Sequence, residues 1–490
     1  MVTREQWAFY GRNGELQQLE TILRRQRWFF ARITGRRRIG KTTLIQRALE
    51  HTRTDRVFYV QIPDSAPAGV LSAFSDAMET FDISPSTIAR PTTLLEMAQT
   101  VGALARAGYV VALDEFQYFA RQKLHEFTSH LQAVVDGLSH EAEHVTGGLF
   151  VLGSLHTELV ALLEDRDAPL YNRTTDTIEL DHLDIASVVE VIGAHAEPTP
   201  ERLLFLWNLF EGVPKFYRDC FEQGVLSADR HQLLDRMFFE SSSPLRSEAD
   251  NWFLGELRGR YDVVLKYVAR QPGCTNSDLA AHVRETSPDS AEQVGGYLKI
   301  LSDKYRMVEK RLPILSKPKA RKGRFYVRDN FLRSWLHALS HQVQAINFRP
   351  RRRLIKTADE RLAEAEGFGL ERLVAALYEE RSRKDVGDFS LTHRIDGFWD
   401  RAGTEIDLIA LDEEARRIRF GTCKRSVDKL LKDTENHEKH VQRFLETNKA
   451  FKSWTIERVA IAPRIEAEAR AQLEEEGLIP QDLLDLTGAL

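Results

Sequence analysis

The chain has 490 residues, which is too many for one hydrophobic core, and its length is typical of about three domains. Its composition, with 29% charged and 42% hydrophobic residues, is that of a soluble globular protein. The net charge of -5 excludes a global attraction to nucleic acid or membranes, so any basic partner surface must be local.

Cysteine usage and hydropathy favour a reducing, cytoplasmic location. Cys220, Cys274 and Cys423 are widely separated and odd in number, which argues against a disulfide framework or a zinc site. The first residues lack the apolar core of a signal peptide, and the sequence has no run of about 18 apolar residues. We therefore expect neither secretion nor a membrane span.

A phosphate-binding motif lies near the N-terminus, after a short turn at 9–12 and an apolar-periodic helix from Glu15. Residues 35–43 match the pattern G-x-x-x-x-G-K-[ST], and they lie between a segment of strand length and a segment with helical spacing. The glycines let backbone N–H groups and the helix N-terminus surround a phosphate. We expect Lys41 to reach the β/γ-phosphates of ATP and Thr42 to ligate Mg²⁺. The predicted nucleotide contacts are Gly35, Arg38, Ile39, Gly40, Lys41, Thr42 and Thr43.

A second motif ends another apolar strand. Residues 109–113 are apolar and are followed by Asp114 and Glu115, at the carboxyl end where a parallel strand presents acids to Mg²⁺ and water. Asp114 is the candidate metal ligand, and Glu115 is the candidate residue that polarises the hydrolytic water. The alternative is that either acid caps the helix that begins near Phe116.

Further strands are predicted at 56–62, 149–154 and 177–180, with a helix over 94–107. Strands that alternate with helices predict an α/β core with a parallel sheet covered on both faces. Ser154 either senses the γ-phosphate or caps the following helix. Arg173 is either an arginine finger, in cis or toward a neighbouring subunit, or part of a surface salt bridge.

Residues 181–255 are predicted to be helical. The segment 211–216 breaks two of these helices, and Pro214 shapes the turn. A small helical lid over the nucleotide is the functional interpretation, with Lys215 facing phosphate; a plain turn is the alternative.

Residues 256–345 predict a winged helix-turn-helix: three helices near 261–269, 276–283 and 291–303, then two strands joined by a basic hairpin. Nine Lys or Arg and one Glu lie between positions 304 and 324. The wing therefore either contacts DNA phosphates or serves as an interdomain strut. The candidate DNA contacts of the hairpin are Lys317, Lys319, Arg321 and Lys322.

Residues 346–366 are predicted to be a basic linker, because a proline and five basic residues occur between 348 and 356 without an acid. Arg351, Arg352 and Arg353 are either a solvated charge run or further DNA contacts.

Residues 367–490 predict a separate domain: a helix near 370–378, strands near 389–395, 405–411 and 418–423, a helix over 427–446 and a strand at 458–462. Acids that hold a divalent metal beside a lysine are what phosphodiester hydrolysis requires. The candidate residues are Glu371, Glu405, Asp407 and Lys424.

The chain resembles the archaeal-type P-loop ATPases of the signal-transducing STAND division, on the motifs at 9–16, 35–43, 114–115, 153–154, 169–173 and 212–214. In P-loop ATPases a segment like 9–16 folds over the adenine, which implies contacts from Gly11 and Arg12; an ordinary amphipathic helix is the alternative. The resemblance implies an ATPase core over 1–180 with the lid and winged helix after it.

The tail is similar to the restriction-endonuclease-like PD-(D/E)XK domain, on Glu371, Asp407 and Lys424. That pattern has an acid two residues before the lysine, where this chain has Thr422. Because a threonine hydroxyl is a poorer Mg²⁺ ligand than a carboxylate, Glu405 and Asp428 are the candidates to compensate. The tail is therefore either a nuclease or a degenerate domain that binds DNA or a protein partner.

Together these features predict a Mg²⁺-dependent ATPase that acts on DNA, as a homo-oligomer, with its nucleotide state controlling the winged-helix and nuclease-like modules. The alternative is an ATP-switched DNA-binding regulator or scaffold with an inert tail. A third possibility is contact with protein partners only, through the basic segments.

Overall fold

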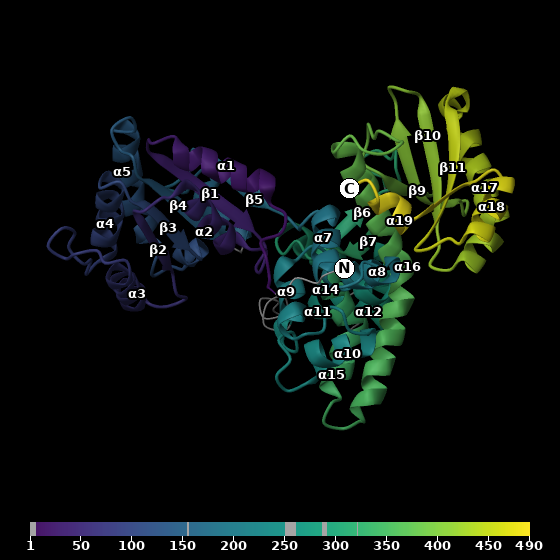
Figure 1. The fold of residues 1–490 in the computed structure, drawn as a ribbon, viewed down its shortest axis with the longest axis horizontal. Helices are drawn as coiled ribbons and strands as arrows, with labels where there is room; N and C mark the ends of the chain where they lie inside the picture. Colours follow the sequence, from purple (N-terminus) through teal and green to yellow (C-terminus); the bar gives the residue numbers. More distant parts are fainter. Residues whose placement is uncertain (1–5, 154–155, 250–260, 287–291, 321) are drawn as a thin grey trace. The chain divides into compact units, whose positions relative to one another are not determined.

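The computed structural model describes residues 6–153, 156–249, 261–286, 292–320 and 322–490 (Figure 1). The chain divides into two compact units. One contains residues 11–182 together with 213–215, and the other contains the residues before 11, 183–212 and 216–490. No described helix combines the length and the apolar character needed to cross a lipid bilayer.

The first unit is built on a five-stranded parallel sheet, which confirms the α/β fold class expected for this part of the chain. Its strand order is β2-β3-β4-β1-β5. Every residue of β3 and β4 is buried, as expected for parallel strands covered on both faces. The strands are β1 (Phe29–Gly35), β2 (Val57–Gln61), β3 (Val110–Asp114), β4 (Gly148–Gly153) and β5 (Asp176–Leu180).

Six α-helices accompany these strands: α1 (Asn13–Arg24), α2 (Lys41–Thr52), α3 (Pro67–Thr80), α4 (Leu94–Arg106), α5 (Glu126–His140) and α6 (His156–Leu163). A short 3-10 helix, η1 (Phe116–Ala120), follows β3. The apolar residues of β2, β3 and β4 pack with those of α3, α4 and α5 into one large core. This core holds the carboxyl ends of the strands rigidly in place.

In the second unit, residues 183–249 are mainly helical, as the sequence predicted for this part of 181–255; residues 250–255 lie outside the described part. The helices are α7 (Ile185–His195), α8 (Pro200–Phe210), α9 (Pro214–Glu222), α10 (Arg230–Leu234) and the π-helical η2 (Asp235–Phe239). Asp184, Thr199 and Asp229 precede three of them, and each side chain accepts a hydrogen bond from the first turn of its helix.

Three helices and a two-stranded antiparallel sheet follow, at the positions predicted from the sequence. The helices are α11 (Tyr261–Arg270), α12 (Asn276–Thr286) and α13 (Val294–Asp303), and the strands are β6 (Val308–Arg311) and β7 (Arg324–Val327). Two short helical segments, α14 (Asn330–Ser334) and α15 (Ser340–Gln344), flank the π-helical η5 (Trp335–Leu339) and lead out of this region.

The expected linker over 346–366 is wrong. Residues Arg351–Arg383 form one continuous helix, α16, which runs straight through the expected domain boundary (Figure 1). Leu354, Ile355, Ala358 and Leu362 are buried at helical spacing, so a core-facing stripe underlies the arginines. Pro350 occupies the N-cap position, where a missing backbone N–H costs nothing.

The C-terminal residues form a mixed sheet in the order β12-β11-β10-β9-β8. The pairs β8–β9 and β9–β10, at one end of the sheet, are antiparallel, whereas β10–β11 and β11–β12 are parallel. The strands are β8 (Asp396–Trp399), β9 (Glu405–Asp412), β10 (Arg417–Cys423), β11 (Thr455–Ala462) and β12 (Ile479–Asp482), with α17 (Val427–Thr447), η6 (Lys449–Ser453), α18 (Ala467–Glu475) and α19 (Leu483–Thr487) around them.

The strand expected at 389–395 is also wrong, because the first strand of this sheet begins at Asp396. Phe389 and Ile395 are buried, but they anchor a loop. The guanidinium groups of Arg417 and Arg419 lie 4.9 and 4.7 Å from the Phe389 ring. Phe389 is thus buried by cation-π packing in a loop and not by pairing within a strand.

Candidate functional site

The phosphate-binding motif forms a loop between β1 and α2. Gly35 ends the strand, and a Cβ added there would lie 2.6 Å from the carbonyl oxygen of Leu180. Gly40 is the N-cap of α2 with φ 92, and Arg38 has φ 67. Left-handed backbone at both positions curls the loop, which is why glycine is required at Gly40. Ile39 is buried, whereas Thr43 is exposed.

Lys41 stands at the centre of this loop. Its Nζ donates hydrogen bonds to the carbonyl oxygens of Gly35 at 2.9 Å and Arg36 at 3.1 Å. Burial lowers the pKa of the Lys41 ammonium to about 8, although the carboxylates of Asp114 and Glu115 oppose this change. The ammonium is therefore a poorly solvated charge that an anion in the loop would stabilise.

The Asp114 carboxylate joins three parts of the unit. Its Oδ2 accepts hydrogen bonds from Thr42 Oγ1 at 2.8 Å and from the Tyr59 hydroxyl at 2.7 Å, and its Oδ1 accepts one from the Glu115 N–H at 2.8 Å. The sequence predicted Thr42 and Asp114 each as a Mg²⁺ ligand, and the structure brings their side chains together. The sequence analysis did not identify Tyr59. The one feature that could have indicated its role is a hydroxyl group within the apolar strand that pairs with β3.

Glu115 follows β3 directly with φ 56 and ψ 37. It precedes η1, but its side chain makes no capping hydrogen bond to that helix, so the capping alternative does not describe it. Instead its carboxylate accepts a hydrogen bond from Gln117 Nε2. The sequence analysis did not identify Gln117, which is buried. Gln117 packs closely against Gly153 at the end of β4, because a Cβ added to Gly153 would lie 2.8 Å from the Gln117 Oε1.

Other predicted residues frame the loop. Gly11 and Arg12 both have φ 63 and form the turn before α1, where Arg12 bonds Glu15 at 2.9 Å and the Asp181 carbonyl. Pro214 comes close to the motif, because its Cγ lies 3.9 Å from the position that a Cβ on Gly40 would take.

The two candidates for transition-state contacts differ. Arg173 forms a two-point ion pair with Asp136 of α5, with Nε–Oδ1 at 2.7 Å and Nη2–Oδ2 at 3.0 Å. This is the salt-bridge alternative that the sequence left open. Ser154 lies outside the described residues.

A second polar cluster lies at the ends of β9 and β10 in the other unit. Lys424 Nζ lies 3.0 Å from Asp407 Oδ2 and 3.2 Å from Asp433 Oδ2. Thr422 Oγ1 lies 3.4 and 3.3 Å from the same two oxygens. The structure therefore unites Asp407 with Lys424 as predicted, and the second acid is Asp433 of α17, whereas Asp428 is exposed.

Two predicted acids of this cluster behave differently. Burial and the Asp407 charge raise the pKa of Glu371 well above its usual range, although Lys424 opposes this change. Glu405 instead pairs with Arg324 at 2.6 Å. Glu371, Glu405 and Asp407 line an open pocket of about 580 Å³. Among the described residues, no three acidic, histidine or cysteine ligand atoms of this region come within 4.8 Å of one another.

The predicted basic contacts are mostly exposed. Lys317, Lys319 and Lys322 are exposed in the hairpin between β6 and β7, and Arg321 lies outside the described residues. The base of this hairpin is tied to β8: Ile314 N donates to the Gly397 carbonyl and Trp399 Nε1 donates to the Lys322 carbonyl, both at 2.9 Å. Arg351, Arg352 and Arg353 are also exposed, with Arg351 3.0 Å from Asp235.

Comparisons with known proteins agree with the nucleotide site. Residues 9–215 match the family model of an ATPase domain found predominantly in Archaea. The uncharacterized protein MJECL04 of Methanocaldococcus jannaschii is 23% identical over 442 residues, which cover 88% of this chain and 92% of that protein.

Solved structures give weaker likenesses. The Walker-type ATPase PABY2304 of Pyrococcus abyssi is 16% identical with a TM-score of 0.49, over 67% of this chain and 96% of that one. The ORC2 protein of Aeropyrum pernix, solved as ADPNP-ADP complexes, is 16% identical with a TM-score of 0.48, over 74% and 96%.

Residues 9–215 thus match an archaeal-type ATPase domain, and this match, together with the phosphate-binding loop, supports ATPase activity.

Proposed function

We propose that this ATPase depends on Mg²⁺ and acts on DNA, and that its nucleotide state controls a winged-helix and a nuclease-like module. The observation that carries the proposal is the set of Lys41, Thr42 and Asp114 at the glycine loop, in which Lys41 and Asp114 are buried. A cation suited to phosphates and two oxygens suited to a metal lie together in this set, which supports the proposal.

The chain's own residues fit Mg²⁺. The Thr42 hydroxyl and the Asp114 carboxylate lie 2.8 Å apart and are hard oxygen donors, which Mg²⁺ prefers. When bound, the ion would neutralise charge that develops on the phosphates during cleavage.

We assign the hydrolytic step to Glu115. Its carboxylate lies one residue beyond Asp114, where Gln117 holds it by a hydrogen bond, so it is oriented to polarise a water at the γ-phosphate. Lys41 exchanges its two carbonyl partners for phosphate oxygens. Ser154 is proposed as a polar sensor of the γ-phosphate, and Arg173 would have to leave Asp136 to act as an arginine finger.

Two substitutions test these roles. Lys41→Ala should abolish ATP turnover, because it removes the charge that offsets the phosphates. Glu115→Gln should still bind ATP but hydrolyse it about 100-fold more slowly or worse, because the amide cannot accept the water proton. Steady-state phosphate release measures the ATP turnover of each variant, and binding of a fluorescent nucleotide measures its affinity. Glu126→Gln, at an exposed residue, is the control. Parent-like turnover by Glu115→Gln would remove this residue from the mechanism.

We propose that α11, α12, α13 and the β6–β7 pair form a winged helix whose hairpin lies on DNA phosphates. Three helices followed by an antiparallel pair support this, and so do the exposed lysines of the hairpin. Because the overall charge is -5, this local basic surface is the part of the chain suited to a polyanion.

Neutralising the hairpin tests DNA contact. Changing Lys317, Lys319, Arg321 and Lys322 together to Gln should weaken DNA binding and flatten its salt dependence, because up to about four phosphate contacts would be lost. Fluorescence anisotropy over a salt series measures both quantities. Changing the exposed Lys429, Lys432, Lys449 and Lys452 is the matched control. Equal salt slopes for the parent and the hairpin variant would exclude the wing from the interface.

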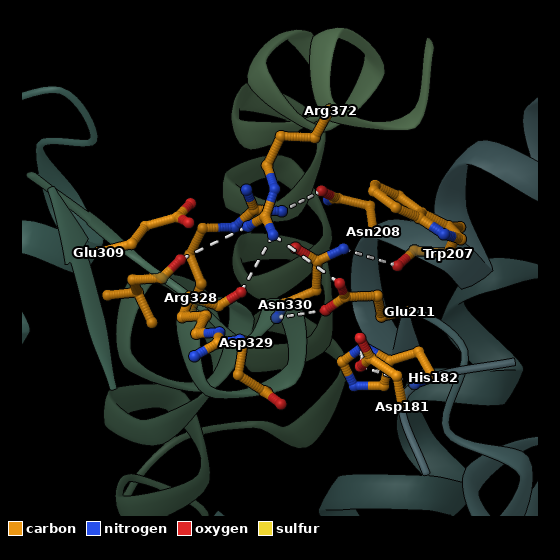
Figure 2. Close-up of polar contacts among 12 residues, drawn as sticks. Asp181, His182, Trp207, Asn208, Glu211, Glu309, Arg328, Asp329, Asn330 and Arg372 are labelled. Carbon is orange, nitrogen blue, oxygen red and sulfur yellow. Dashed lines mark hydrogen bonds and ion pairs between the residues drawn. The ribbon is translucent and has the colours of Figure 1, made fainter. Parts of the chain in front are cut away.

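The turn at 211–215 supports control by the nucleotide. Pro214 lies near Gly40 of the ATPase unit, while Glu211 is anchored in the other unit. Figure 2 shows this anchor: Glu211 Oε2 accepts a hydrogen bond from the Asn330 N–H at 3.2 Å, and its Oε1 lies 3.7 Å from Arg372. Arg372 neighbours Glu371 on α16, so one short segment connects the phosphate loop with the helix that lines the acidic pocket.

Hydrogen exchange tests this connection. In the parent, adding ATP with Mg²⁺ should change the exchange rates of amides in residues 366–380, and Glu211→Gln should reduce that change, because it weakens the anchor to Arg372. Turnover should stay within about threefold of the parent, since Glu211 is not assigned to the chemistry. Glu222→Gln, at an exposed ion pair, is the control. An undiminished response in Glu211→Gln would contradict the proposed route.

The second candidate function is an ATP-switched DNA-binding regulator or scaffold with an inert nuclease-like domain. Thr422 in place of an acid, beside Asp407, is the observation that favours it. Incubation with linear, circular and branched DNA plus Mg²⁺ or Mn²⁺ separates the two candidates. Cutting by the parent that disappears in Asp407→Ala and Lys424→Ala supports a nuclease, and no cutting of any substrate supports the scaffold.

Assembly into a homo-oligomer is part of the proposal. Because Arg173 is ion-paired with Asp136, a neighbouring subunit would supply the positive charge that stabilises the transition state. Sedimentation with and without ATP tests it. A monomer under both conditions would contradict it.

A further inference from the structure

An aromatic side chain projects from the turn that joins α15 to α16. Phe348 is 86% exposed, the largest value among the large hydrophobic residues of the described chain. The turn is closed by backbone hydrogen bonds, because the N–H groups of Phe348 and Arg349 both donate to the Ala345 carbonyl, at 3.0 and 3.1 Å. Figure 1 shows this turn at the end of α16 that lies away from the C-terminal sheet. A single exposed apolar residue is common on protein surfaces, so its surroundings decide what it can bind.

The surroundings of this ring are basic. Four exposed arginines neighbour it in the sequence, and the stretch 346–358 contains no acid. One of them, Arg351, pairs with Asp235 at 3.0 Å. In the described part of the chain the other three have no carboxylate partner: Arg349, Arg352 and Arg353. On a chain whose net charge is -5, these three guanidinium groups and the ring form a local surface that is complementary to a polyanion.

The placement of the arginines does not stabilise the free protein. Arg351, Arg352 and Arg353 form the first turn of α16, which contains no acid. Cations in this position repel one another and the positive end of the helix dipole. The stability of α16 comes instead from its buried apolar stripe. A bound anion would remove the repulsion, which supports a binding role for the arginines.

The chemistry of the turn fits DNA better than it fits a lipid surface. A helix that binds a membrane surface exposes a broad apolar face, but the apolar stripe of α16 is buried in the protein. One exposed ring beside several guanidinium groups is instead the combination that holds single-stranded nucleic acid, in which bases stack on aromatic rings and cations follow the phosphates. Arginine suits the phosphates because its planar fork donates two hydrogen bonds at once.

We propose that Phe348, Arg349, Arg352 and Arg353 form a second DNA contact, separate from the wing, that binds unpaired bases. The Phe348 ring stacks on an unpaired base, and the three arginines contact the phosphates on either side of it. Because stacking requires a free base face, this contact selects single-stranded or branched DNA over a closed duplex. It rests on the proposed action on DNA and names the form of DNA that the chain prefers.

Fluorescence anisotropy with a labelled single strand, and with a duplex of the same sequence, tests the contact on the full chain. Phe348→Ala should weaken single-strand binding about tenfold and change duplex binding by less than about twofold, because the wing remains intact. Phe348→Trp should bind single strands at least as tightly as the parent. Phe348→Leu should bind them as weakly as Phe348→Ala, since leucine is apolar but has no flat ring. Leu484→Ala, at another exposed apolar residue, is the control.

The arginines are tested by their effect on salt dependence. Changing Arg349, Arg352 and Arg353 together to Gln should lower the slope of log affinity against log salt for single strands by up to about two, because three phosphate contacts are lost. Changing three exposed lysines elsewhere to Gln removes the same charge and should leave the slope unchanged: Lys429, Lys449 and Lys452. All the altered side chains are exposed, and circular dichroism checks that each variant is folded.

The outcomes separate this inference from the proposed function. Single-strand affinities of Phe348→Ala or Phe348→Leu equal to that of the parent would overturn the stacking contact, while duplex binding by the parent would leave the action on DNA intact. A parent that binds neither form of DNA would contradict both. In that case, binding of the parent to vesicles of phosphatidylserine and phosphatidylcholine, lost in Phe348→Ala, would assign the turn to a lipid surface instead.

Discussion

The buried carboxylate of Asp114 is the constraint on which the nucleotide unit depends. A charge that is only 6% exposed must be compensated, and Thr42, Tyr59 and the Glu115 amide provide three hydrogen bonds to it. Hydrogen bonds to charged groups contribute about 1.5–3 kcal/mol each, so together they fix the phosphate loop against two neighbouring strands. Lys41 adds a positive charge that is also poorly solvated.

The same design recurs in the C-terminal sheet on a different scaffold. Asp407 and Lys424 lie at adjacent strand ends, and an acid from a helix completes the group. Here the lysine is already paired with two carboxylates, whereas Lys41 is bonded only to backbone carbonyls in the described contacts. The two lysines therefore differ in their partners, since Lys424 is paired with carboxylates and Lys41 is not.

Much of the nucleotide unit could be predicted from sequence, because its signals are local. The glycine spacing, the lysine and the apolar strand before each motif lie within short windows, and the parallel sheet follows from their alternation. The partners that failed prediction are distant in sequence. Tyr59, Gln117 and Asp433 reach their partners only through strand pairing and helix packing. The linker prediction was wrong because the run of arginines drew attention away from the apolar residues that alternate with them at helical spacing. The strand prediction at 389–395 was wrong because Phe389 is buried by two guanidinium groups and not by strand pairing.

The central claim is that a triphosphate with its metal binds between the loop after Gly35 and the acids after Leu113. Calorimetric titration of ATP and of ADP into the purified, folded chain with Mg²⁺ tests it most directly. The account predicts that one nucleotide binds saturably to each chain. It also predicts that ATP binding is lost when Mg²⁺ is removed by a chelator. A folded chain that takes up neither nucleotide would contradict it.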